Sequence, residues 1–308
     1  MARPAPGMSE FIQQVINGVS LGSIYALIAL GYTMVYGILR FINFAHADIF
    51  MIGAYTAYFS APVIIKVTGG NLFMAGPLAM VFAMIICSIL GVTIEKLAYR
   101  PLRSRPTIVV LITAIGVSFF LEYGGQLVFG PDPKPFPDLI PRANVVDAGG
   151  VVVGTTPLVV IGTAIGLMML LRWIVMSTRT GTAMRALSQN LEAARLMGIN
   201  IDRVVSFTFI LGSSLAAAAA VLYASIYPSI NPLMGIFPGL KAFIAAVVGG
   251  IGNLVGAALG GMIIGVTETF VTGYISPTYR DAIAFGILII ILLFRPAGLL
   301  GKFESERV

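Results

Sequence analysis

The chain has 308 residues, of which 58% are apolar and only 10% are charged. Soluble domains contain about 45–50% apolar and about 25% charged residues, so this composition excludes a soluble globular protein. The net charge of +6 indicates basic loops beside a membrane rather than a nucleic-acid partner, since the basic residues gather at the ends of apolar segments. A single cysteine, Cys87, excludes an intramolecular disulfide framework.

The first half of the chain contains four apolar segments that approach or exceed the about 20 residues needed to cross a bilayer as a helix. They are residues 11–30, 49–65, 72–94 and 107–129. The apolar stretch that begins at residue 11 is too long for the core of a cleavable signal, and further spans follow it. We therefore expect it to stay in the membrane as the first span.

Polar residues separate the first two of these segments. Arg40, Asn43, His46 and Asp48 interrupt an otherwise apolar run, and polar groups at membrane depth are tolerated only against protein or a water-filled cavity. The sequence therefore predicts a broken or re-entrant element over residues 31–48. We expect Asn43, His46 and Asp48 to line a translocation path, although a histidine beside an asparagine is also typical of a satisfied packing group.

Three other ionisable residues lie near membrane depth, namely Glu122, Lys241 and Glu268. Glu268 is the fourth candidate for the path, because a charge in this setting costs several kcal/mol and usually marks a route for solute or protons. Lys241 has the simpler alternative of extending its amine to a membrane surface.

The connections between segments indicate their sidedness. Residues 95–106 contain four cations and one acid, and residues 176–203 are also rich in arginine, whereas residues 130–157 are rich in proline and aspartate. Basic loops mark the cytoplasm, so the first two connections are predicted inside and the third outside. Eight full crossings would leave both termini on the same side of the membrane. The assigned loops put the N-terminus outside, whereas the basic C-terminal tail is expected inside. A half-helix near residues 31–47 or 238–250 would reconcile the two ends.

The second half adds apolar segments at 158–174, 204–226 and 274–294, and a glycine-rich segment that runs to about residue 271. Gly252, Gly256 and Gly260 recur every four residues, a spacing that lets two helix backbones approach closely in lipid. We therefore predict an all-α, polytopic membrane protein of about eight transmembrane helices, forming one domain over residues 1–308.

Residues 176–203 are the one long polar stretch between apolar runs in this half. Good helix formers fill positions 182–197, and Gly198 follows where a helix commonly ends. The apolar positions Leu187, Leu191 and Ala194 recur at helical spacing. This pattern predicts one amphipathic helix, which either rests on lipid headgroups or docks a soluble partner.

Several kinds of chemistry have no support in the sequence. No phosphate-binding G-x-x-x-x-G-K-[ST] motif is present, and the glycine run at 249–265 has no lysine. One histidine and one cysteine do not make a tetrahedral metal site, and no H-E-x-x-H occurs. We expect no metal or cofactor on this chain, which makes a membrane enzyme a weak alternative.

Three blocks resemble the permeases of branched-chain amino acid ABC importers. They are I-N-F-A-H at 42–46 followed by M-I-G-A-Y at 51–55, E-K-L-A-Y-R-P at 95–101, and the stretch from 239 to 252. A fourth, Glu192-Ala193-Ala194 followed by Gly198, is similar to the docking half of the EAA loop of ABC importer permeases.

This resemblance implies a multi-pass permease of the bacterial inner membrane, surrounded by lipid. Its expected partners are a second homologous permease, two cytoplasmic ATPases that use the ATP, and a periplasmic binding protein. The ATPases would couple through Leu187, Leu191, Glu192, Ala193, Ala194 and Gly198. A permease for urea or short amides shares these blocks and stays open as an alternative. More remote alternatives are a non-ABC channel, a secondary transporter or a purely structural subunit.

Overall fold

The computed structural model describes residues 7–148 and 151–301. Within these residues, eight helices are long and apolar enough to cross a membrane, which confirms an all-α polytopic membrane protein. The spanning helices are α1 (Met8–Leu39), α2 (His46–Val67), α3 (Leu72–Ile94), α4 (Thr107–Phe129), α5 (Thr155–Ser177), α8 (Ile201–Ile226), α10 (Leu254–Phe270) and α11 (Arg280–Phe294).

Shorter elements join these spans. Beyond α3, the helix continues through a π turn, η1 (Glu95–Tyr99), and a 3₁₀ turn, η2 (Arg100–Leu102), and similar turns, η3 (Val271–Ile275) and η4 (Pro277–Tyr279), join α10 to α11. Three short helices are α6 (Arg179–Gln189), α7 (Leu191–Leu196) and α9 (Ile236–Gly249). Antiparallel strand pairs are β1 (Lys134–Pro135) with β4 (Ser229–Ile230), and β2 (Asn144–Ala148) with β3 (Val151–Gly154).

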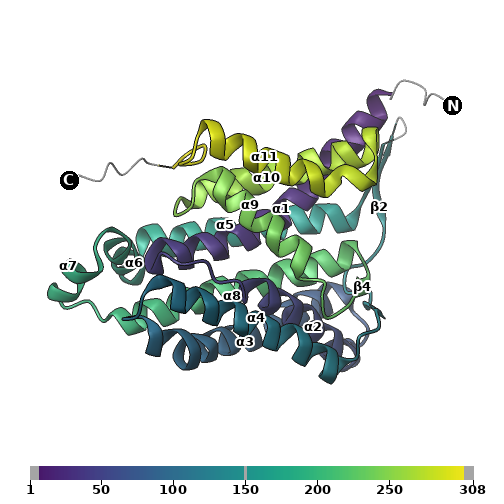
Figure 1. The fold of residues 1–308 in the computed structure, drawn as a ribbon. Helices are drawn as coiled ribbons and strands as arrows, with labels where there is room; N and C mark the ends of the chain where they lie inside the picture. The colour runs from purple at the N-terminus through teal and green to yellow at the C-terminus, as the bar shows by residue number, and fades with distance from the viewer. Residues whose placement is uncertain (1–6, 149–150, 302–308) are drawn as a thin grey trace.

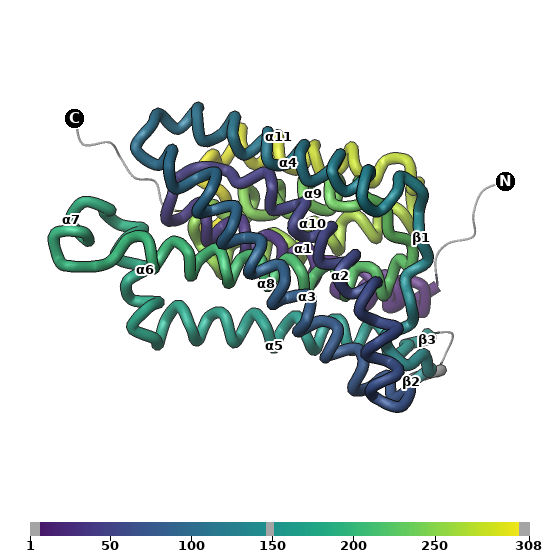
Figure 2. Tube along the Cα trace, turned by 90° about the horizontal axis from the view of Figure 1, so that it is seen from below, coloured from purple at the N-terminus to yellow at the C-terminus, as the bar shows by residue number. Residues whose placement is uncertain are grey.

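The two ends of the helix bundle differ in charge. Figure 1 shows α6 and α7 at one end and the strands at the other, and Figure 2 shows the same separation from below. The α6–α7 end carries many of the basic side chains, including Lys96, Arg100, Arg103, Arg105, Arg179, Arg185, Arg195 and Arg203. Because basic loops stay in the cytoplasm, this end is the cytoplasmic one.

Helix α9 supplies the half crossing that reconciles the two termini. Its 14 residues span about 21 Å, less than the about 30 Å of a bilayer core. Its last turn meets the C-terminal segment, where the amide of Leu299 donates to Val248 O at 2.8 Å. The described chain therefore begins at the outer end and finishes at the cytoplasmic end (Figure 1).

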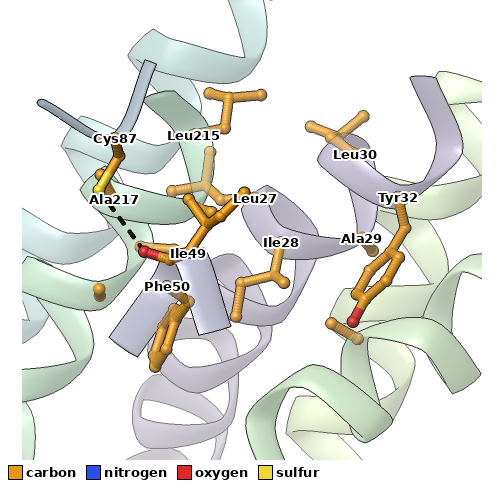
Figure 3. Close-up of a cluster of buried hydrophobic side chains, with 14 of the residues drawn as sticks. Leu27, Ile28, Ala29, Leu30, Tyr32, Ile49, Phe50, Cys87, Leu215 and Ala217 are labelled. Atoms are coloured by element: carbon orange, nitrogen blue, oxygen red, sulfur yellow. Dashed lines mark hydrogen bonds between the residues drawn. The ribbon is translucent and has the colours of Figure 1, made fainter. Parts of the chain in front are cut away.

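Helix α1 is the centre of the fold. Its side chains from Ser20 to Val35 are buried on all sides, against α8, α9 and α10 among others. Figure 3 shows Leu27 and Ile28 of α1 near Ile49 of α2, with Leu30 and Tyr32 of α1 farther along the helix. Small residues make this crowding possible, because a β-carbon on Gly265 would collide with the backbone of Gly22.

The break after the first span is shorter than the sequence predicted. Helix α1 continues through residues 31–39, and the chain departs from helical geometry only at residues 40–45, beginning with Arg40 at φ 55°. The prediction was wrong for 31–39 because glycine is tolerated in a helix that is packed on all sides. His46 lies beside Ile28, so residues 40–45 lead the chain back along α1 before α2 begins.

The glycine-rich segment is two packed helices rather than one. Helices α9 and α10 are joined by residues 250–253, where Gly250 and Gly252 adopt φ of 102° and 92°. A β-carbon on Gly249 would collide with Gly256 O, so the backbones of the two helices touch there. Only glycine adopts such φ values readily, which is why the glycine-rich segment divides into two helices at this turn.

Candidate functional site

The polar cytoplasmic segment forms two helices instead of the single helix predicted over 182–197. Asn190 leaves helical geometry, with φ −154° and ψ 113°, and its side-chain Oδ1 accepts a 2.9 Å hydrogen bond from the Ala193 amide. Asparagine is a preferred N-cap because its side chain replaces the missing helical partner of such an amide. The cap therefore ends α6 and begins α7, and composition alone did not reveal it.

Gly198 ends α7 in the left-handed conformation, at φ 80°. Its amide donates to Arg195 O at 3.0 Å, and the amide of Ile199 donates to Ala194 O at 3.1 Å. These two bonds are those of the Schellman motif, which satisfies the free carbonyls of a helix end. The turn directs the chain toward α8, whose first residues are capped by Asn200.

The apolar side of the two helices faces the interior of this chain. Leu187 is 2% exposed and Ala194 is 4% exposed, and Leu191 packs partly against the same core. The expectation that these three side chains fill a groove on an ATPase is therefore corrected for Leu187 and Ala194. An amphipathic pattern does not distinguish a chain's own core from a partner.

A different set of side chains faces outward on α7. Leu196 is 88% exposed and Met197 is 83% exposed, and they lie beside exposed Glu192 and Ala193. We call Glu192, Ala193, Leu196 and Met197 the α7 face. Two large exposed apolar side chains at a cytoplasmic helix end are typical of a surface that another molecule covers.

An ionic network ties this segment to the preceding cytoplasmic connection. Arg103 contacts Glu95 at 2.7 Å and Asp202 at 2.8 Å, and Arg100 pairs with Asp202 as well. Glu95 is fully buried and also accepts a 2.8 Å hydrogen bond from Ser206. These contacts therefore hold the start of α8 against the η1–η2 turns.

Asn43 and His46 of the break are buried, and each has a polar partner in the bundle. Asn43 Oδ1 accepts a 2.6 Å hydrogen bond from Tyr99, and His46 Nε2 lies 3.2 Å from Ile28 O. Asn43 and His46 are at most 2% exposed. In this conformation the two side chains bind the break to α1 and to η1.

Asp48 lies two residues after His46 and faces α4. It is 1% exposed and accepts a 2.5 Å hydrogen bond from Ser118. Glu122, one turn beyond Ser118, interacts electrostatically with Asp48. The sequence therefore located two buried carboxyl groups near membrane depth, and the structure brings them together.

Some polar atoms in this region have no hydrogen-bond partner among the described residues. They are Asn43 Nδ2, Thr33 Oγ1, Tyr55 Oη and Ser20 Oγ, together with Tyr274 Oη near the outer end. Leaving a buried polar group unpaired costs about 1–3 kcal/mol, so these atoms are free to accept a further partner.

Glu268 belongs to a second buried cluster. It lies 2.7 Å from Lys241 of α9 and accepts a 2.9 Å hydrogen bond from Tyr25 of α1. Lys241 also forms an ion pair with Asp281 of α11, at 2.7 Å but without hydrogen-bond geometry. The lysine is only 4% exposed, so it connects three helices instead of reaching a membrane surface.

The predicted glycine face is divided between a helix and a turn. On α10, β-carbons at Gly256 and Gly260 would collide with Gly249 O and Ala245 O, which places both glycines against α9. Gly252, predicted on the same face, instead precedes the helix and has nothing within 4 Å of its added β-carbon. Its place in the turn removes it from the contact.

Comparison with known proteins decides the family. Residues 14–292 match the model described as branched-chain amino acid transport system / permease component. The chain belongs to this permease family.

Several known proteins match this chain along nearly its whole length. BraD of Pseudomonas aeruginosa, a high-affinity branched-chain amino acid transport system permease protein, is 40% identical over 98% of this chain and 100% of its own. LivH of Escherichia coli K12, described in the same words, is 42% identical over 97% of this chain and 98% of its own. A probable LivH from Methanocaldococcus jannaschii is 29% identical over 94% and 92%. A solved metal-chelate type ABC transporter, inward-facing, aligns with 96% of this chain and 89% of its own at TM-score 0.45 and 14% identity.

Sequence reasoning missed several residues that hold the buried polar groups. Tyr99, Ser118 and Arg103 hold Asn43, Asp48 and Glu95, yet each partner lies on a different helix or turn. The basic stretch at 95–106 was the available signal for Arg103, since its one acid sits eight residues before that arginine. Nothing local marks Tyr99 or Ser118. Among residues 7–148 and 151–301, no group of three or more potential metal ligands comes together.

Proposed function

We propose that this chain is the membrane-spanning permease subunit of an ATP-driven importer of branched-chain amino acids, in a bacterial inner membrane. The observation that carries the proposal is the family match over residues 14–292, with relatives at 40–42% identity along almost the whole chain. Both relatives are described as branched-chain amino acid permeases, which favours leucine, isoleucine and valine over urea or short amides as the substrate.

A permease component acts with the other components of its transport system. We propose a second homologous permease, two cytoplasmic ATPases and a periplasmic binding protein as those components. The exposed α7 face supports an ATPase contact, because Leu196 and Met197 present large apolar side chains at the cytoplasmic end. ATP would be used by the ATPases, and this chain would bind no cofactor itself.

The ionic network supports a route for mechanical coupling. Closure of the ATPases would push α7, and the Schellman turn at Gly198 would pass the displacement to the start of α8. Because Arg103 joins Asp202 to buried Glu95, α3 and α4 would follow α8. Rigid helices that shift together at such contacts are a common means of alternating access. In this scheme, Glu192, Ala193 and Gly198 remain the proposed coupling residues, with Leu187, Leu191 and Ala194 supporting them from inside.

The buried polar residues support a path beside α1. A free amino acid carries two charges, and an apolar path alone would remove their hydration at a cost of many kcal/mol. We propose that Asn43, His46, Asp48 and Glu268 border this path and reach the solute when the helices move. The unpaired Asn43 Nδ2 is one donor already available for that purpose.

Reconstituted transport tests the proposal. The full complex, purified with its co-expressed subunits and placed in vesicles, should take up leucine in the presence of ATP inside and loaded binding protein outside. Uptake of urea without leucine would contradict the proposed substrate class. A complex that purifies without ATPase subunits would contradict the importer itself.

A further inference from the structure

A groove of about 520 Å³ opens on the cytoplasmic end of the bundle, between α3 and the start of α8. Its cations are Lys96 and Arg100 from the η turns and Arg203 from α8. Its apolar lining includes Val92 of α3 and Phe207 and Ile210 of α8. We call these six residues the α3–α8 groove.

Two of the three cations of the groove, Lys96 and Arg203, are not neutralised by a carboxylate of the described residues. Lys96 and Arg203 are exposed, and no carboxylate among the described residues forms an ion pair with either. Asp202 also lines the groove, but it already pairs with Arg100 and Arg103. The groove therefore presents a net positive charge to an anion.

The apolar lining extends below the level of these charges. Phe207 and Ile210 lie six and nine residues after Ile201, the first residue of α8, which corresponds to about 9 and 14 Å along the helix. Val92 belongs to the spanning part of α3, whose neighbouring side chain Ile89 is 60% exposed. A partner from the cytosol would meet the cations but not this deeper part.

We propose that the α3–α8 groove binds an anionic phospholipid of the inner leaflet, with its phosphate between Lys96 and Arg203 and an acyl chain along Phe207 and Ile210. Basic pockets between transmembrane helices on the cytoplasmic side commonly hold anionic headgroups. The bound lipid lies against Arg100 and Asp202, at the edge of the ionic network. The lipid composition of the membrane therefore bears on how firmly α8 and the η turns are held.

Native mass spectrometry of the purified full chain tests this site. Protein equilibrated with phosphatidylglycerol and phosphatidylcholine of identical acyl chains should retain phosphatidylglycerol preferentially. Each basic residue near an anionic surface contributes about a fivefold change in binding, so Lys96→Gln with Arg203→Gln should reduce that preference roughly 25-fold. Lys96→Arg with Arg203→Lys keeps both charges and should retain it.

Arg179→Gln is the matched control, since Arg179 is an exposed cation at the same end outside the groove. An equal loss of preference in this control would show a general charge effect and overturn the proposal. Displacement of phosphatidylglycerol by millimolar inorganic phosphate would identify a phosphate site and overturn the lipid assignment. Unchanged lipid retention in the Lys96→Gln, Arg203→Gln protein, with loss of copurifying ATPase, would assign the groove to the ATPase instead.

Discussion

The imidazole ring of His46 occupies the space that a side chain at Gly31 would need. A β-carbon on Gly31 would collide with Nε2 and Cε1 of the ring, and the same ring lies edge-on to Tyr32 at 4.7 Å between centroids. A β-carbon on Gly212 of α8 would lie 3.8 Å from Cε1 of the same ring. Helices α1, α2 and α8 therefore meet at one histidine.

Gly31→Ala should destabilise the permease by about 1–3 kcal/mol, because extra volume in a packed core displaces neighbouring side chains. Thermal unfolding in detergent should show a lowered Tm. Gly116→Ala on α4 is the control, since nothing lies within 4 Å of the β-carbon added there. An equal Tm for the two variants would show that the His46 contact yields without cost.

Lys241→Met alone should lower the stability of the permease more than Lys241→Met combined with Glu268→Gln. The single substitution leaves Glu268 buried without its cation, and breaking a buried ion pair costs about 3–5 kcal/mol. Lys241→Met combined with Glu268→Gln removes both charges, so part of the lost stability should return. A double-mutant cycle measures this coupling. If the Tm losses of Lys241→Met and Glu268→Gln simply add in the double variant, the two residues are not coupled.

Arg103 should matter far more than Arg100, although both pair with Asp202. Arg103→Gln leaves fully buried Glu95 without its cation, with an expected cost of several kcal/mol. The side chains of the Arg100–Asp202 pair are 42% and 43% exposed, so Arg100→Gln should cost about 1 kcal/mol or less. Tm and ATP-driven leucine uptake measured on both variants check this order, and equal effects would refute it.

Gly198→Val should uncouple ATP hydrolysis from loaded binding protein while the protein still inserts in the membrane. A β-branched residue resists the positive φ at this position, whereas asparagine tolerates it, so Gly198→Asn should keep most of the coupling. Stimulation of ATPase activity by substrate-loaded binding protein is the measurement. Full stimulation in the valine variant would argue against transmission through this turn.

Leu196→Asp should weaken the association of the ATPases, because it places a charge on the proposed contact surface of the α7 face. Glu192→Ala should also weaken it, since a hydrogen bond to a charged group contributes about 1.5–3 kcal/mol. Copurification of the ATPase subunits reports both effects. Arg179→Asp on α6 is the control, because Arg179 is also exposed at this end but does not belong to the α7 face. Normal copurification of the ATPases with the Leu196→Asp and Glu192→Ala variants would support the alternative that α7 only rests on lipid headgroups.

The sequence by itself determined the class of protein, the spans, the basic ends of the helices and the resemblance to a permease family. These properties depend on composition and on runs of about 20 residues, which are local along the chain. It also located Asn43, His46, Asp48 and Glu268 as polar residues near membrane depth. Their chemical types are visible in the sequence whatever the helices do.

Only the tertiary structure decided what these residues touch. Tyr99 meets Asn43, Lys241 meets Glu268 and Arg103 meets Asp202 across separations of 56, 27 and 99 positions. Such pairs depend on how closely the helices pack, and that packing is set by small residues on distant segments. The same holds for α6 and α7, whose apolar side suits the core of this chain as well as a partner. Burial of Leu187 and exposure of Leu196 were decided when the helices came together.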